Sequence, residues 1–132
     1  MPISALEKLQ RWLSSYPRWE ACPARICVLP KEVKETSRRE DMLGNTLVGF
    51  RCYVNLLWEM ETQGEAGANT TNLLDFQNWV REQSALGLVP QFGDIPANEQ
   101  IQTEKGGLTA GAQIVTYTVT LVADFMKVYE VS

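Results

Sequence analysis

Apolar and polar residues alternate with a period of two in two long stretches of the chain. One stretch spans residues 47–61, and its apolar positions are Val48, Phe50, Cys52, Val54, Leu56, Trp58 and Met60. The other spans residues 112–131, and its apolar positions are Val115, Tyr117, Val119, Leu121, Ala123 and Phe125. This period is typical of a β-strand with one buried face. Because the two lengths match, we predict that the strands pair antiparallel in one sheet.

A period of three to four residues predicts two helices. The first covers residues 4–15, and its apolar stripe is Ile3, Leu6, Leu9, Leu13 and Tyr16. Ser4 and Glu7 have the spacing of a capping box, and Pro17 should end the helix. Trp12 lies off the stripe and is interpreted as packing against a neighbouring element rather than binding a ligand.

The second helix is predicted over residues 71–86. Its inner stripe is Leu73, Phe76, Val80 and Gln83. Asn69, Thr70 and Thr71 are candidate caps, Asp75 is expected in the first turn, and Gly87 should follow the last turn. The helix is expected to cover the apolar face of the sheet.

Two shorter strands complete the predicted sheet. One covers residues 25–29 and should stop at Pro30. The other covers residues 99–104 and leads into the Gly-rich segment 105–111, which we expect to be a flexible hairpin tip. The 132 residues fit a single domain, 1–132. The predicted fold is α+β, a mainly antiparallel sheet of about four strands packed against two helices.

The most charged part of the chain is the segment 31–45. Four basic residues (Lys31, Lys34, Arg38, Arg39) balance four acidic ones (Glu32, Glu35, Glu40, Asp41). A solvated loop or short irregular strand is one interpretation of this composition. A contact arm between identical subunits is the other, since mixed charges set specificity between partners.

The residues that usually carry chemistry are sparse. The chain has no histidine, so it lacks Ser-His-Asp and Cys-His pairs. Three cysteines (Cys22, Cys27, Cys52) offer no second pair for a zinc site and suggest a reducing environment. The glycines of 106–111 do not match a phosphate loop, which requires a following Lys and helix. We therefore expect no enzyme activity, no cofactor and no metal.

Charge and hydropathy also restrict the partners. The net charge of −4 argues against binding of bare or specific nucleic acid, which needs a basic face. No apolar run reaches the length of about eighteen residues expected of a membrane span. Tyr53, Tyr117 and Tyr129 lie on predicted strands and could mark an interface, although Tyr117 fits the core equally well.

Several phrases of the sequence resemble a known group of phage proteins. They are SALEKLQRWLSSYP near the start, WEMETQGEAGANTTNLLDFQNWV in the middle and YTVTLVADFMKVYE at the end. The chain is similar to small minor capsid or tail-completion proteins of prophages, and most closely to the tail terminator family of long-tailed phages. The resemblance covers most of the chain but contains no catalytic motif.

This resemblance implies a structural protein of the virion, assembled in the cytoplasm of the host bacterium. Tail terminators are α+β proteins that form a ring, a hexamer in that family, at the head–tail junction. The implied partners are further copies of the chain, the tail tube and the head-completion proteins. By our own inference, ring or tube contacts should come from Arg38, Arg39, Lys105, Gly106 and Gly107.

Two other hypotheses stay open. The chain could be a small monomeric ligand-binding α+β module without catalytic activity, with a pocket between the second helix and the sheet. It could also be an enzyme of unfamiliar type.

Overall fold

The computed structural model describes residues 5–17, 26–61 and 67–131. Its elements, in chain order, are α1 (Ala5–Ser14), β1 (Ile26–Glu40), β2 (Thr46–Glu61), α2 (Ala68–Ala85), the 3₁₀ turn η2 (Pro96–Asn98), β3 (Gln100–Ala110) and β4 (Ile114–Tyr129). The four strands form one antiparallel sheet in the order β1-β2-β4-β3. The predicted α+β fold, with four strands and two helices, is confirmed.

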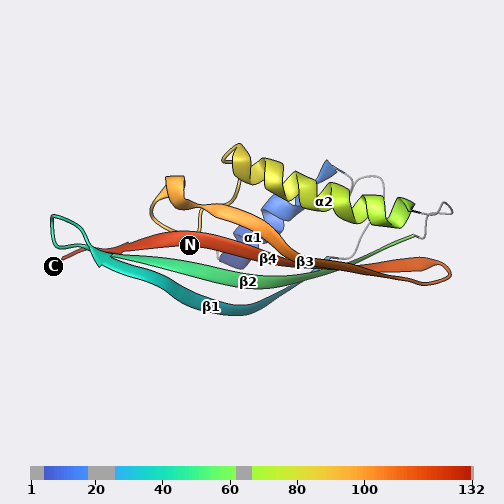
Figure 1. Cartoon of the computed structure of the whole chain (residues 1–132), viewed down its shortest axis with the longest axis horizontal. Coiled ribbons are helices and arrows are strands. Elements are labelled where there is room, and N and C mark those ends of the chain that lie inside the picture. The colour runs from blue at the N-terminus through green and yellow to red at the C-terminus, as the bar shows by residue number, and fades with distance from the viewer. Residues whose placement is uncertain (1–4, 18–25, 62–66, 132) are drawn as a thin grey trace.

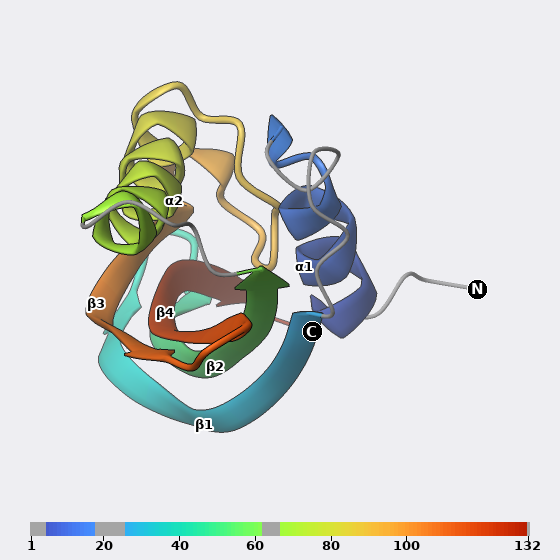
Figure 2. The same ribbon diagram turned by 90° about the vertical axis from the view of Figure 1, so that its right-hand side faces the viewer.

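The two long strands predicted from alternation lie at the centre of this sheet. β2 and β4 each have 16 residues and pair antiparallel without a bulge, from Thr46 opposite Tyr129 to Glu61 opposite Ile114. The sheet curves strongly, and both helices lie on its concave side (Figures 1 and 2). The alternating apolar residues therefore share one face, which the helices cover.

Aromatic side chains form the middle of the core. Trp58 on β2 stacks on Tyr117 on β4, with ring centroids 5.2 Å apart, and Phe76 of α2 lies 4.9 Å from Trp58. Trp12 of α1 stacks on Trp79 of α2 at 4.9 Å. Trp12 thus packs between helices, as interpreted from the sequence, and Tyr117 belongs to the core.

Of the two predicted ends of α2, only the C-terminal one is confirmed. Gly87 has a φ of 69°, its N–H bonds to the Ser84 carbonyl, and the Leu88 N–H bonds to the Gln83 carbonyl. These bonds are the expected glycine termination of a helix. The other end was predicted wrongly: α2 begins at Ala68 after Gly67, so Asp75 lies beyond the first turn.

The strand at 26–40 corrects another expectation. β1 does not stop at Pro30 but continues to Glu40, so most of the charged segment is a strand and not a loop. β1 is an edge strand, where a missing proline N–H need not break a hydrogen bond of the sheet. The pairing with β2 shifts between Pro30 and Glu32, next to the proline, and again between Glu35 and Ser37. Such bulges bend a strand and increase its local twist.

The Gly-rich segment corrects a third expectation. β3 runs through Lys105, Gly106 and Gly107 to Ala110, and only residues 111–113 turn into β4. Gly106 lies under α2, where an added Cβ would collide with the Gln77 amide and touch Leu73 Cδ1 at 3.4 Å. This glycine thus permits close packing of a helix on a strand and is not part of a hairpin tip.

Candidate assembly surface

A helix covers part of one edge of the sheet. The Ser84 hydroxyl of α2 donates to the carbonyl oxygen of Ile101 at 2.6 Å and accepts from the Ile101 N–H at 2.8 Å. Ile101 lies on β3, the edge strand next to β4, so both of its edge-facing backbone groups are bonded within the chain. Together with the packing of Gly106 under Gln77, these bonds cover the β3 edge at two points, while most residues of β3 stay exposed.

The opposite edge is open. β2 is the only described element that packs extensively against β1. Every residue from 29 to 40 is exposed. In Figure 1, β1 forms the border of the sheet on the side away from α2. A free strand edge of 15 residues presents unpaired N–H and C=O groups along its length and is a surface for adding another strand.

Charged side chains line this open edge, and several of them are already paired. Lys34 Nζ lies 3.5 Å from a Glu32 oxygen, and Arg38 Nε donates to Glu35 Oε1 at 3.1 Å. The hydrogen bond and negative charge of Glu35 raise the pKa of Arg38. Such exposed pairs add little to the stability of the fold.

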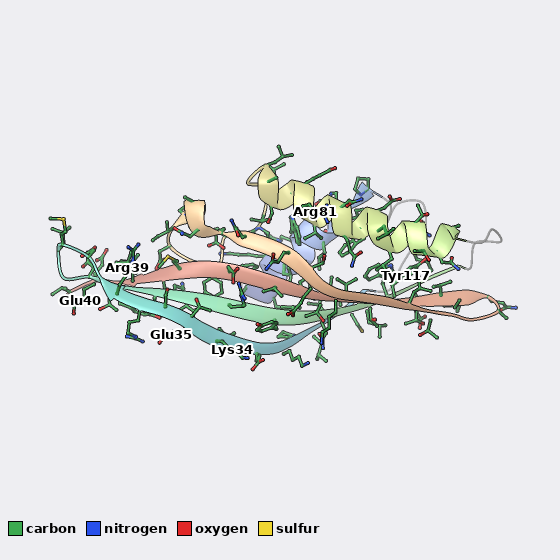
Figure 3. The ribbon with its side chains drawn as sticks, viewed as in Figure 1. Lys34, Glu35, Arg39, Glu40, Arg81 and Tyr117 are labelled. Carbon is green, nitrogen blue, oxygen red and sulfur yellow. The ribbon has the colours of Figure 1, made fainter. Side chains whose placement is uncertain are left out.

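The two arginines expected at an interface lie on opposite faces of β1. Arg38 pairs with the buried Val48 on the helix-bearing side of the sheet, and the next residue, Arg39, pairs with Leu47. No ion pair of Arg39 is found among the described residues. Figure 3 shows Lys34, Glu35, Arg39 and Glu40 following β1 along the border of the sheet.

The structure does not bring the five expected interface residues together. Arg38 and Arg39 lie on β1, whereas Lys105, Gly106 and Gly107 lie on β3, and β2 and β4 separate the two strands. Lys105 pairs with Thr120, Gly106 with Val119 and Gly107 with Thr118 inside the sheet. The β3 residues therefore do not form a common surface with the arginines.

A rigid hairpin tip, residues 41–45, extends the open edge. Asp41 Oδ1 accepts the N–H groups of Leu43 and Asn45, both at 2.9 Å. Asn45 in turn accepts the Val131 N–H at 3.1 Å, which ties the tip to the end of the chain after β4. Within this frame Met42 is fully exposed and Leu43 is 83% exposed.

The charge of Asp41 supports the same turn. Desolvation raises the pKa of this carboxyl group, but the bonds from Asn45, Leu43 and Gly44 outweigh it, and the pKa lies below its usual range. Asp41 is therefore ionised at neutral pH. The sequence prediction missed this tip, although Asp41 followed by Gly44 and Asn45 is a pattern typical of turns.

An apolar groove lies beneath α1 on the concave side of the sheet. Its volume is about 600 Å³, and its lining includes Leu6, Leu9, Val33, Val54, Phe92 and Phe125. Lys8 and Lys127 also line it. Cys52 lies in the same wall, and burial raises the pKa of its thiol, which favours the neutral form.

The convex face of the sheet carries pairs of polar side chains. Arg51 forms two hydrogen bonds with Asp124, at 2.7 and 3.1 Å, and this partner raises the arginine pKa. The Thr120 hydroxyl donates to Asn55 at 3.1 Å. These pairs cross from β2 to β4 and fix the register of the sheet.

Two other kinds of site are absent from the described part of the chain. No three His, Cys, Asp or Glu side chains gather where they could hold a metal ion. Neither described helix combines the length and the hydropathy needed to cross a membrane.

Comparison of the chain with family models, with curated proteins and with solved structures finds no match in any of the three.

Proposed function

We propose that the chain is a structural virion protein of a phage or prophage, a tail terminator that assembles into a ring at the head–tail junction. The observation that carries this proposal is the open edge of β1, in contrast to the opposite edge of the sheet, β3, which α2 covers in part. The sequence resemblance adds support, since its most recognisable phrase, residues 117–130, falls on the central strand β4.

The charges and bulges of β1 favour pairing with a specific partner strand over pairing with any exposed strand. Charged side chains and bulges on an edge strand discourage pairing with arbitrary strands. β1 has both features, with bulges near Pro30 and Thr36 and alternating charges from Lys31 to Glu40. A partner strand of complementary charge would still fit, and head-to-tail contacts between identical copies close into rings when the rotation permits.

In this proposal the partners are further copies of the chain, the phage tail tube and the head-completion proteins. The protein catalyses no reaction, needs no cofactor and reads no nucleic acid sequence. It resides in the virion after assembly in the bacterial cytoplasm.

The test combines mass measurement with tail binding. Light scattering behind a sizing column, over a wide concentration range, should reveal a closed oligomer of defined mass. Electron microscopy of purified tail tubes mixed with the protein should reveal capped ends. A protein that stays monomeric at every concentration and leaves the tube ends bare would overturn the proposal.

A second candidate function is a monomeric ligand-binding module, and the apolar groove of about 600 Å³ favours it. The groove lies beneath α1, whereas the sequence hypothesis placed a pocket beneath the second helix. A hollow between α2 and β3 does exist, but it is lined mainly by polar residues such as Gln77, Arg81 and Gln102. A strict monomer whose melting temperature rises with a small apolar ligand would favour this candidate.

A further inference from the structure

We propose that the hairpin tip 41–45 of one copy docks into the apolar groove beneath α1 of a second copy. This inference rests on the self-assembly in the proposed function and names the surfaces that would carry it. It does not depend on the head–tail role.

The tip has the properties of an inserting element. Met42 and Leu43 are two adjacent apolar side chains, fully and 83% exposed. Water is a poor environment for both, so their burial against a partner is favourable. The bonds of Asp41 and Asn45 hold the turn in place before any partner arrives, so little conformational entropy remains to be lost on docking.

The groove has the properties of the receiving site. Its walls contain apolar side chains that the chain itself leaves partly uncovered: Leu6 of α1 is 39% exposed and Val33 of β1 is 59% exposed. Its volume of about 600 Å³ is in the range of pockets that bind molecules larger than two side chains. The tip therefore fits by size and by polarity.

Charge complementarity selects a second copy as the occupant. The tip carries the carboxylate of Asp41, which is ionised at neutral pH, beside its apolar residues, and Glu40 at the end of β1 adds a second carboxylate next to the tip. The groove carries two ammonium groups, Lys8 and Lys127. Lys8 Nζ donates to the Gln91 carbonyl oxygen at 2.9 Å, which positions one of these cations at the groove wall.

The position of the tip requires an intermolecular contact. In Figure 1 the hairpin between β1 and β2 projects past both helices, at the end of the sheet where the chain also terminates. The groove lies beneath α1, farther along the same sheet. The tip and the groove are thus different surfaces, so each copy would offer a tip to one neighbour and a groove to another, a head-to-tail contact.

Two variants and their mixture test this contact. Met42→Ser combined with Leu43→Ser removes the apolar tip and leaves the groove intact. Leu6→Glu places a negative charge in the groove and leaves the tip intact. The matched control is Leu74→Ser with Leu86→Ser, which removes two exposed leucines at α2. Circular dichroism and melting temperature establish that each variant is folded.

The wild type and the control should form oligomers of the same mass by light scattering, and each of the two variants alone should remain monomeric. A mixture of the two variants should form a 1:1 dimer, since one intact tip meets one intact groove. Assembly of the tip variant at wild-type mass, or a mixture that stays monomeric, would overturn the inference.

The outcomes separate this inference from the proposed function. A tip variant that still forms rings and caps tail tubes leaves the proposed function standing and removes only the tip contact. A monomeric wild type overturns the inference outright, and its binding to tail tubes then decides the proposed function separately. A monomeric wild type that binds an apolar dye in the groove assigns the groove to a small ligand.

Discussion

Ser84 on α2 forms hydrogen bonds with both backbone groups of Ile101 on β3. The hydroxyl accepts the Ile101 N–H at 2.8 Å and donates to the Ile101 carbonyl oxygen at 2.6 Å. The side chain thus occupies a place that a neighbouring strand would otherwise take. This relationship makes the two edges of the sheet unequal, and the open one is β1.

Replacing Ser84 with Ala should lower the free energy of unfolding by about 1–3 kcal/mol, because it leaves two partly buried backbone groups without partners. Urea denaturation measures the change. Ser14→Ala is the control, since the Ser14 hydroxyl is exposed and bonds only to Arg11 of its own helix. A Ser84 variant as stable as the Ser14 variant would contradict the account of the β3 edge.

Two glycines should respond differently to alanine. A Cβ on Gly93 would overlap the backbone carbonyl of Met126 on β4, where the neighbouring Asp94 N–H also bonds at 2.7 Å. The backbone of a paired strand cannot easily move aside, so Gly93→Ala should lower the free energy of unfolding by about 1–3 kcal/mol.

Gly107→Ala is the matched control, because its Cβ would meet only Thr118 Oγ1 at 3.5 Å. It should leave both stability and assembly near wild type. A Gly107 variant that folds but fails to assemble would place this residue at the interface.

How much of the fold could be predicted from the sequence depends on whether an element is determined by local or by distant residues. The central strands β2 and β4 follow from alternation because each buries one face, and the Gly87 termination follows from local backbone geometry. The course of β1 past Pro30 depends on its being an edge strand, a property of strand order that no local pattern contains. The role of Gly106 likewise depends on Gln77, a residue 29 positions earlier in the chain.

Only part of the candidate site could be predicted from the sequence, because the rest depends on contacts between distant residues. The charged segment drew attention to Arg38 and Arg39, and both lie on the open edge. Lys105 to Gly107 were included because a glycine run suggested a loop, whereas all three lie on a strand and Gly106 packs closely against α2. The groove beneath α1 gathers side chains from both helical and strand segments, and no local signal predicts it.

Charge reversal at Arg38 and Arg39 should separate folding from assembly. Both residues are exposed, so Arg38→Glu with Arg39→Glu should change the unfolding free energy by no more than about 0.5 kcal/mol. Light scattering should detect a loss of the oligomer, because the charged segment would then carry six acidic and two basic side chains in place of four of each. Arg81→Glu on α2, away from that edge in Figure 3, is the control and should assemble normally. Equal assembly of the two variants would remove the arginines from the interface.

Glu99 should give the protein an unusual pH response. Burial raises the pKa of this carboxyl group, although the N–H groups of Gly93 and Phe92 and the charges of Lys8 and Lys127 oppose the shift. A raised pKa means that the folded state favours the protonated form. Stability from this group is therefore fully present below the unfolded pKa of about 4.3 and is lost as the pH rises through the folded pKa.

Glu99→Gln keeps an oxygen for the two N–H groups, which bond to Glu99 Oε1 at 3.0 and 2.6 Å, and removes the titration. Denaturation curves at a series of pH values should diverge upward from about pH 4.3, with the wild type losing stability relative to the variant. Parallel curves would contradict the assignment of a raised pKa to Glu99.

Hydrogen exchange followed by mass spectrometry, at concentrations below and above assembly, tests most directly whether β1 is the edge on which copies meet. Light scattering on the same samples defines the two states. We expect the amides of residues 29–45 to exchange more slowly in the oligomer, while those of β3, which lies at the opposite edge of the sheet, change little. Slower exchange confined to β3 or α2, with residues 29–45 unchanged in a proven oligomer, would contradict this expectation.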